Sequence, residues 1–422
     1  PVGSDRQNGA RRRPKVVVLT TFRVADRGHG GQLRSFHLYG ALARHADVEI
    51  VSLTDGGEAG STALAPGLVE TAVPVSEAQR RAAEAMSLAV GLPVSDLAAG
   101  TEIERTPAYL RRLRAATRNA DVVILAEPYL HPALAAAGVD LPFVYDAFNV
   151  EADLKGDVLP TTAAGRAVHD QVVALEARVS AEAAAITACS RIDARALAAA
   201  GRRPTTDVTV VPNGTDVAAF AGPDPERRRR QGERWLARYR SIDPRARGLE
   251  AIAVFVGSWH PPNLDAAEQV IKAAPYARDV LFVLGGRHGD AFAGRKRLPP
   301  NVVFTGVIPT SAKDALLDAA HVAVNPVRLG SGTNLKIIEY LAAGIPVAST
   351  AFGVRGLDVA NGVHAVIGDD IPATVRAVLD DPEAAAARAV AGRALVEARY
   401  DWQGLGDRLW TVVAALAGTR TG

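Results

Sequence analysis

A cluster of residues between positions 330 and 339 has the backbone and side chains needed to hold a phosphate group. Gly330 and Gly332 allow the backbone to approach a ligand closely, and Thr333–Asn334 can cap the start of a helix. Lys336 would lie in the first turn of that helix, where free N–H groups already favour an anion. Glu339 follows one turn later. An anion site combined with a cation and a carboxylate indicates a nucleotide diphosphate.

Two predicted strands and one predicted helix position this cluster. The apolar run His321–Asn325 precedes it and the run Ile345–Ser349 follows it, and both are typical of buried parallel strands. Between them the sequence predicts a helix over residues 334–343 that stops at Gly344. The cluster would therefore follow the carboxyl end of a parallel strand, which is where open α/β sheets bind ligands.

The first predicted strand, Lys15–Thr20, is also followed by glycines. A polar loop with Gly28, Gly30 and Gly31 leads to a predicted helix over Leu33–Arg44. These glycines do not fall as GxGxxG, and the loop of roughly ten residues is too long for a dinucleotide-binding turn. A long glycine loop could instead close over a phosphate group that approaches from elsewhere, and an ordinary surface loop is the alternative.

Polar side chains follow two further predicted strands, Asp121–Ala126 and Pro142–Ala147. Because the carboxyl ends of parallel strands meet at one edge of a sheet, these side chains are candidates for a ligand cleft. Each of them alone could equally be a helix cap or a turn residue. The candidates are Glu127, Tyr129, His131, Asp146, Asn149 and Glu151.

The length of 422 residues predicts two domains, and the alternation of strands and helices restarts after a charged stretch. We expect a disordered basic tail over 1–14, a first Rossmann-like domain over 15–220, and a linker with an exposed charged helix over 221–249. A second Rossmann-like domain would span 250–400, and a C-terminal helix over 401–422 would return to the first domain. The fold class is α/β, with two doubly wound domains facing each other across a cleft. Residues 55–120 predict helical stretches with little chemistry.

The composition excludes several classes of protein. Apolar residues make up 48% of the chain and charged residues 22%, as in globular proteins, and the net charge of +2 gives no overall field for nucleic acid. The single cysteine, Cys189, excludes an intramolecular disulfide and a multi-cysteine zinc site. We find no apolar run of about 18 residues and no signal-peptide pattern, so we expect a cytoplasmic protein without stable membrane insertion.

The order of the motifs resembles the retaining nucleotide-sugar glycosyltransferases of family 4, which have the two-domain GT-B architecture. The resemblance covers nearly the whole chain beyond residue 14. Its motifs are specific in combination, although each is weak alone. They are Gly30–Gly31, VVPNGTDVAAF at 210–220, VFVGS at 254–258, NVVFTGVIP at 301–309 and SGTNLKIIEYLAAGIPVAST at 331–350.

The resemblance implies a role for each matching position. The amides of Gly332, Thr333 and Asn334, together with Lys336, would hold the diphosphate, and the Gly30–Gly31 loop would close over it. Glu339 would bind the ribose hydroxyls. The backbone at Val307–Ile308 would meet the base, and Gly257 would allow approach to the phosphates. The acceptor, a small molecule or a glycan, would lie near His29, Glu127, Tyr129, Asn149 and Glu151. The donor would be a sugar of UDP, GDP or dTDP, and neither a metal nor another cofactor is implied.

The chain departs from the family pattern in three respects. Many members carry a glutamate where this chain has Ser331, and Arg and Lys where it has Ser258 and Leu264. Many also carry a histidine where this chain has Ala126. We therefore expect Lys336 to replace the missing cations, with His260 as the second candidate. Ser331 would make sugar contacts that differ from those of the family.

The predicted function is transfer of a glycosyl group from a nucleoside-diphosphate sugar, with retention and without a metal. Oriented amides, a helix dipole and Lys336 could stabilise the charge on the leaving group. A nucleotide-sugar epimerase or a phosphorylase on the same fold is an alternative, and so is a non-catalytic nucleotide-sugar binder. An NAD-dependent oxidoreductase is disfavoured because GxGxxG is missing.

Overall fold

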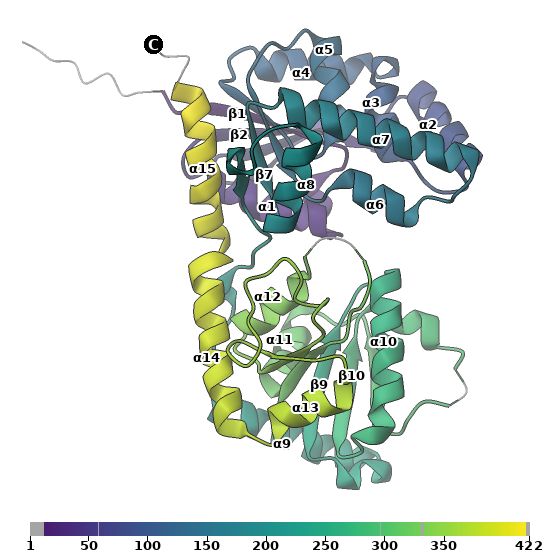
Figure 1. Cartoon of the computed structure of the whole chain (residues 1–422), viewed down its shortest axis with the longest axis vertical. Coiled ribbons are helices and arrows are strands. Elements are labelled where there is room, and N and C mark those ends of the chain that lie inside the picture. Colours follow the sequence, from purple (N-terminus) through teal and green to yellow (C-terminus); the bar gives the residue numbers. More distant parts are fainter. Residues whose placement is uncertain (1–11, 58, 296, 331–332, 419–422) are drawn as a thin grey trace, which may run out of the picture. The chain divides into compact units, whose positions relative to one another are not determined.

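The computed structural model describes residues 12–57, 59–295, 297–330 and 333–418, which form two compact units. Unit 1 is the described part of Pro1–Val211 together with that of Leu405–Gly422, and unit 2 is the described part of Pro212–Gly404. Each unit is built on a largely parallel sheet with helices packed on it (Figure 1). This confirms the predicted pair of Rossmann-like α/β domains.

Unit 1 contains an eight-stranded sheet in the order β3-β4-β2-β1-β5-β6-β7-β8. The pairs are parallel except β3 with β4. Strand β1 lies in the interior, and Val16, Val17 and Val18 have no exposed surface, as expected for a β-branched run covered on both faces. The strands are β1 Lys15–Thr20, β2 Asp47–Thr54, β3 Gly60–Ala65, β4 Leu68–Pro74, β5 Val122–Leu125, β6 Phe143–Ala147, β7 Ala185–Ala188 and β8 Val208–Val210.

Helices follow nearly every strand of unit 1. Leucines of α4, α5 and α8 pack into one core with the strands β1, β2 and β5. The helices are α1 Gly30–Leu42, α2 Glu77–Val90, α3 Ser95–Thr101, α4 Pro107–Thr117, α5 His131–Ala137, α6 Glu151–Val158, α7 Ala163–Glu182, α8 Arg191–Ala200 and α15 Trp402–Gly418.

The β3–β4 hairpin was not predicted, because residues 55–120 were interpreted as helical. Strand β4 joins the sheet parallel to β2, and β3 forms the edge of the sheet antiparallel to β4. The segment Leu68–Pro74 does not alternate regularly between apolar and polar residues, as a strand with one exposed face would, and its neighbouring Ala72 and Val73 are both buried. Its turn at Gly67 was the available sequence signal.

Unit 2 contains a six-stranded parallel sheet in the order β11-β10-β9-β12-β13-β14. Helices α10 and α13 pack on one face, and α9, α11 and α12 pack on the other. The strands are β9 Ala251–Val256, β10 Val280–Gly285, β11 Val302–Gly306, β12 Val322–Asn325, β13 Val347–Ser349 and β14 Val366–Ile367. The helices are α9 Pro225–Ile242, α10 Pro261–Ala273, α11 Thr310–Ala319, α12 Leu335–Ala342, α13 Ile371–Leu379 and α14 Pro382–Arg399.

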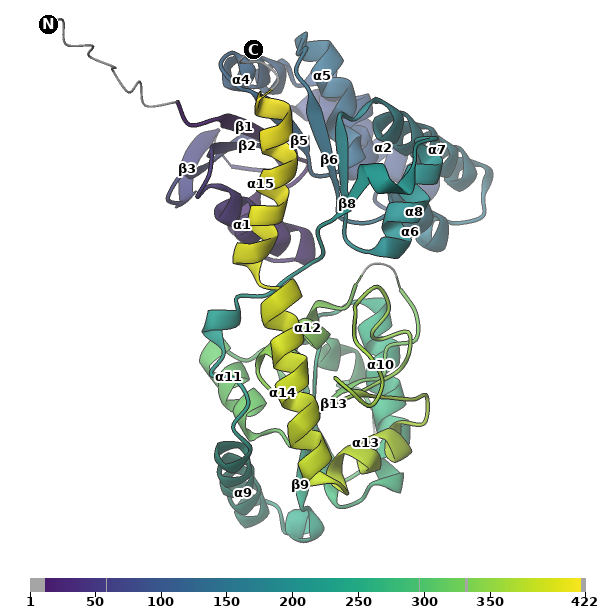
Figure 2. The same ribbon diagram turned by 60° about the vertical axis from the view of Figure 1, so that its left-hand side comes forward.

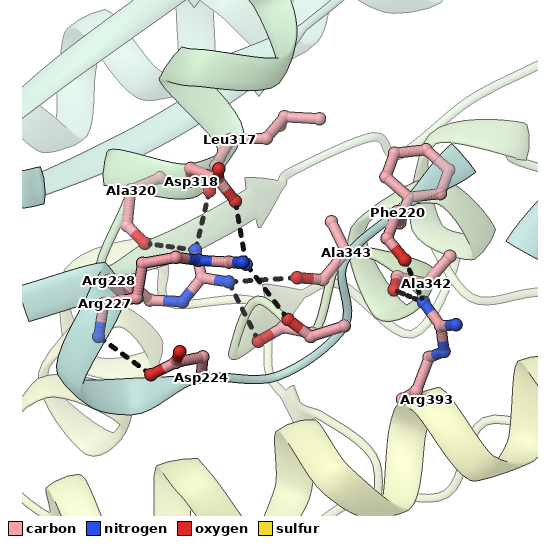
Figure 3. A network of polar contacts seen from close by, with 12 residues as sticks. Phe220, Asp224, Arg227, Arg228, Leu317, Asp318, Ala320, Ala342, Ala343 and Arg393 are labelled. Atoms are coloured by element: carbon pink, nitrogen blue, oxygen red, sulfur yellow. Dashed lines mark hydrogen bonds and ion pairs between the residues drawn. The ribbon is translucent and has the colours of Figure 1, made fainter. Parts of the chain in front are cut away.

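The stretch predicted as a linker, 221–249, is part of unit 2 and contains α9. Figure 3 shows how the buried Arg228 guanidinium binds this helix to its neighbours. It donates to the carbonyls of Leu317 and Ala320 at the end of α11, at 2.6 and 3.0 Å. It also donates to the carbonyls of Ala343 and Gly344 after α12, at 3.0 and 3.1 Å. The prediction of an exposed linker helix is therefore wrong at this face, because arginine can satisfy helix-end carbonyls that would otherwise lack partners.

The two ends of the chain contribute to unit 1. Of the predicted tail, residues 1–11 lie outside the described residues, but Arg12 pairs with Asp121 at 2.7 Å and is therefore ordered. Helix α15 lies beside α1, where Arg44 pairs with Asp407 at 2.6 Å and His45 stacks on Trp410. Helix α14 packs on α12 within unit 2 (Figure 2). In the described part of the chain, no helix combines the length and apolar character that crossing a membrane requires.

Candidate functional site

Lys336 points from the first turn of α12 toward the carboxyl end of β9. Its Nζ lies 4.5 Å from the centre of the Phe255 ring and donates to Oδ1 of Asn263 at 2.5 Å. Burial lowers the pKa of Lys336 to about 7, although the nearby Glu339 carboxylate acts in the opposite direction. Among the described residues, the ammonium contacts an amide and an aromatic ring and forms no ion pair. An anionic ligand would therefore stabilise its charge.

The start of α12 has no side-chain cap. Asn334 occupies the N-cap position, but its Nδ2 donates to the carbonyl of Gly353 at 3.1 Å and its side chain makes no cap bond. Thr333 Oγ1 accepts from Asn213 at 3.0 Å. Among the described residues no side chain caps the first N–H groups of the helix, and the helix dipole at this end favours a negative ligand. The predicted donor residues Ser331 and Gly332 lie outside the described residues.

The turn between β9 and α10 lies beside Lys336. Asn263 Nδ2 donates to the carbonyl and hydroxyl oxygens of Ser258, at 3.0 and 3.3 Å, while its Oδ1 accepts from Lys336. One amide side chain therefore joins this turn to the cation. His260 is exposed at the start of α10, and burial together with the charge of Lys336 lowers the pKa of its imidazole. A neutral imidazole can donate a hydrogen bond to a phosphate but adds no charge.

His288 was not predicted as a site residue, although the glycine pair before it marks the end of β10. It has no exposed surface, packs edge-on against Phe255 with ring centroids 5.3 Å apart, and places Nδ1 2.8 Å from the carbonyl oxygen of Gly257. Gly286 has φ +117°, and a Cβ there would lie 2.0 Å from the same oxygen. The β9–α10 turn is thus fixed from behind, which keeps Gly257 and Ser258 in place.

The predicted ribose and base contacts lie on the helices and turns next along the sheet. Glu339 pairs with Lys313 of α11 at 3.4 Å and keeps about a third of its side chain exposed, so it can accept from hydroxyl groups. Val307 is 71% exposed after β11, whereas Ile308 packs into the core. The part of unit 2 that we call the donor edge therefore comprises Gly257, Ser258, His260, Asn263, Val307, Thr333, Asn334, Lys336 and Glu339.

In unit 1 the predicted glycine loop is shorter than expected. Helix α1 begins at Gly30 rather than at Leu33, so Gly30 and Gly31 form its first turn. Gln32 fixes the preceding loop by accepting from the N–H groups of Gly28 and His29 at 2.6 and 3.1 Å. The exposed His29 ring packs edge-on against Phe22 at 4.8 Å. The glycines thus present helix-start amides instead of a long mobile loop.

The predicted acceptor residues of unit 1 form a carboxylate cluster that is mostly buried. Tyr129 has no exposed surface and donates to Glu151 at 2.7 Å, while Asn149 donates to the other Glu151 oxygen at 3.3 Å. Glu127 accepts from the Thr21 hydroxyl, and burial together with the charge of Glu151 raises its pKa to about 8. Tyr129 and Glu151 therefore lie behind the surface, and Glu127 reaches it.

Two further candidates are structural. Asp146 is fully buried and accepts from Arg34 at 2.7 Å and from Tyr39 at 2.9 Å. His131 pairs with Glu182 at 3.0 Å. These groups satisfy each other and are not available to a ligand in this state.

A pocket of about 1050 Å³ opens at the carboxyl edge of the unit 1 sheet. Thr21 after β1, Val75 after β4 and Glu127 after β5 line its base, and α2 and α3 form its wall. No sequence signal predicts this wall, because the lining residues of α2 and α3 are ordinary helix-surface types. The pocket nevertheless lies at the carboxyl ends of the parallel strands, which is where open α/β sheets bind ligands.

The sequence matches two family descriptions in the order of the two units. Residues 29–214 match the glycosyl transferase 4-like domain, and residues 250–381 match the glycosyl transferases group 1. Together these matches cover most of the chain. The chain matches no curated protein sequence.

Solved structures share the fold along the whole chain. Sucrose-phosphate synthase from Thermosynechococcus elongatus is 16% identical with a TM-score of 0.70, and the match covers 96% of this chain and 100% of that one. HepE from Anabaena, solved in complex with UDP-glucose, is 12% identical with a TM-score of 0.61, covering 95% and 99%. The α,α-trehalose 6-phosphate synthase from Burkholderia multivorans is 14% identical with a TM-score of 0.60, covering 97% and 98%.

Proposed function

Because the chain belongs to the family 4 type of glycosyltransferases with the GT-B fold, we propose that it transfers a hexosyl group from a nucleoside-diphosphate sugar with retention and without a metal. The observation that carries the proposal is the donor edge of unit 2. There, α12 has an uncapped start, and the Lys336 ammonium of its first turn donates to Asn263, which itself donates to Ser258 in the turn that follows β9. An arrangement of this kind binds a diphosphate and stabilises it as it leaves.

The chemical step needs stabilisation of negative charge more than it needs a base. The bond between the anomeric carbon and the diphosphate oxygen breaks, and a bond forms between that carbon and the acceptor oxygen on the same face. The acceptor proton passes to the departing phosphate oxygen. Lys336 and the α12 amides would bind the growing charge on the diphosphate, because preorganised donors stabilise a charge that develops in the transition state.

The hydroxyl groups of the donor would be held further along α12. Glu339 lies one turn beyond Lys336 and is partly exposed beside Lys313. An ionised carboxylate can accept from two neighbouring hydroxyls, as a ribose presents them. The exposed Val307 would place its backbone against the base. UDP is the first nucleotide to test, because the solved HepE structures contain UDP and UDP-glucose.

Metal independence rests on the charge that the chain itself supplies. Lys336 and the α12 amides would take over charge neutralisation. Equal turnover with a chelator and with added Mg²⁺ is the expected result, and a loss of turnover with the chelator would contradict this part of the proposal.

The main test combines binding with product analysis. A thermal-shift panel of UDP, GDP, dTDP and their sugars identifies the donor, and a ligand at 100 times its dissociation constant should stabilise by about 2.7 kcal/mol. With an acceptor extract, a transferase releases the nucleoside diphosphate and forms a glycoside whose anomeric configuration shows retention. A new nucleotide sugar formed without acceptor would indicate an epimerase. A phosphate-dependent sugar phosphate would indicate a phosphorylase, and nucleotide binding with no turnover would indicate a binder.

A further inference from the structure

We propose that the acceptor, which the family resemblance places against unit 1, is an alcohol with an apolar body and without a phosphate or carboxylate group, and that it fills the unit 1 pocket. The inference rests on the proposed transfer reaction and names its second substrate class. It is carried by the lining of one pocket within unit 1, which combines an apolar wall, a hydrogen-bonding carboxyl group at its base and unpaired carboxylates at its rim.

The size and wall of the pocket fit an apolar body. Its volume of about 1050 Å³ exceeds the space that a single hexose fills and lies at the upper end of the range for drug-sized ligands. Leu53 and Val75 from the sheet, Ala83 from α2 and Ala99 from α3 contribute carbon atoms to the lining. Leu92, in the turn between the two helices, adds a partly exposed side chain. A ligand that covers this wall removes apolar surface from water.

The base of the pocket offers a place for one hydroxyl group. Both hydrogen bonds from Thr21 go to Oε2 of Glu127, which leaves Oε1 without a hydrogen-bond partner in the described part of the chain. Glu127 also lines the pocket, so its carboxyl group is within reach of a ligand there. Because the pKa of the Glu127 carboxyl is raised to about 8, the group is mostly protonated at neutral pH and can both donate and accept.

The charges around the pocket disfavour an anionic ligand. Asp55 and Glu84 line it, and neither carboxylate has an ion pair among the described residues. Arg80 is the basic residue of the lining, but it is engaged by Glu77 at 2.5 Å and by the carbonyls of Asp55 and Val75 at 3.3 Å. A phosphate or carboxylate on the acceptor would meet these carboxylates without a free cation. The lining therefore discriminates against anions by repulsion.

The test compares two probes that share one apolar body. Binding of β-naphthol and of β-naphthyl phosphate to the full chain is followed by naphthalene fluorescence, and UDP binding is followed by thermal shift in the same samples. We expect β-naphthol to bind at least about tenfold more tightly than its phosphate ester. With the UDP-sugar that stabilises the protein, we expect a naphthyl glycoside.

Two pairs of variants locate the binding. Ala83→Phe fills the pocket and should weaken β-naphthol binding by about tenfold or more, because the added ring takes the place of the ligand body. Ala85→Phe, an exposed position on the same helix outside the lining, should leave it unchanged. Glu84→Lys adds a cation at the rim of the pocket, so the ratio of the Kd of β-naphthyl phosphate to that of β-naphthol should fall severalfold. Glu104→Lys, at a position outside the lining, should leave this ratio unchanged.

The outcomes separate the pocket from the reaction. Equal or tighter binding of β-naphthyl phosphate, or equal effects of Ala83→Phe and Ala85→Phe, would overturn the proposal. If UDP and β-naphthol both bind but no naphthyl glycoside forms, the assignment of the pocket to the acceptor fails. If no nucleotide stabilises the protein while β-naphthol still binds, the proposed transfer reaction itself fails.

Discussion

The carboxyl edges of the two sheets have the same architecture and opposite electrostatics. In the described part of the chain, the donor edge of unit 2 presents an uncapped helix start and a lysine without an ion pair, so the polar groups at the start of α12 are hydrogen-bond donors. At the corresponding edge of unit 1, burial and the charge of Glu151 raise the pKa of Glu127, and Glu84 adds an exposed carboxylate to the pocket lining. The comparison teaches that the same fold can present hydrogen-bond donors beside one sheet edge and carboxyl groups beside the other, and the two proposals depend on this contrast.

Removal of the Lys336 ammonium is expected to have the largest effect on this contrast. Lys336→Ala should lower turnover by about 10²–10³-fold, because an electrostatic stabiliser of the leaving diphosphate is lost. Steady-state kinetics with the identified donor would measure this. Lys272→Ala, which removes an exposed lysine of α10, is the matched control and should change little. An unchanged turnover in Lys336→Ala would move the role to His260 or to the backbone amides.

Replacement of the ionised acceptor at Glu339 should weaken donor binding. Glu339→Gln is expected to raise KM for the donor by roughly 10- to 100-fold, which corresponds to the loss of hydrogen bonds to a charged group, while kcat changes less. Asp314→Asn, at an exposed position of neighbouring α11, is the control. A fall in kcat with an unchanged KM would show that Glu339 acts on the transition state instead.

The pH dependence of donor binding should report the titration of Lys336. Its pKa of about 7 in the free protein would rise when a diphosphate binds, so binding takes up a proton above pH 7. UDP affinity should therefore fall by about tenfold per pH unit above neutrality and be flat below it. Calorimetry of UDP binding to Lys336→Arg, whose cation does not titrate in this range, measures the part of the pH dependence that comes from the nucleotide. Subtracting this part from the slope of the parent leaves the part due to Lys336. Equal slopes in the parent and the arginine variant would contradict the assignment.

The carboxylate edge of unit 1 should show the smallest effect, and it concerns stability. The folded-state pKa of Glu127 is raised to about 8, above its ordinary value, so the folded state binds more protons between these two values. Stability should therefore fall as pH rises through this window. Glu127→Gln should remove part of the fall and raise Tm at pH 8 relative to the parent by a few degrees, about 2–4 °C for each kcal/mol. A Tm difference that does not depend on pH would show that Glu127 is ionised.

The sequence predicted the sheets better than it predicted the surroundings of the site. Strand β1 was predicted with the observed bounds, because a β-branched run of six residues covered on both faces has few alternative structures. The α12 start and Lys336 were found through local helix signals. The contact of Lys336 with Asn263 crosses 73 positions, so no local pattern contains it.

Two failures have a common physical cause. The charged run predicts that Arg228 lies on an exposed helix face, yet Arg228 binds carbonyls at the ends of two helices that lie far away in sequence. No sequence pattern singles out His288, in the turn that follows β10, although its Nδ1 lies 2.8 Å from the Gly257 carbonyl oxygen. Both are polar residues whose partners are backbone groups. Backbone partners leave no trace in side-chain composition, so only the fold reveals them.

The two glycines at the end of β10, Gly285 and Gly286, should differ greatly in their tolerance to mutation. A side chain at Gly286 would need an unfavourable φ and would meet the Gly257 oxygen at 2.0 Å, whereas the nearest neighbour of a Cβ at Gly285 is 3.5 Å away. In a library of variants selected for donor binding, position 286 should thus keep glycine while position 285 accepts alanine. Of these two adjacent glycines, only Gly286 would be invariant in the selected library, because it is the one that packs against the β9–α10 turn.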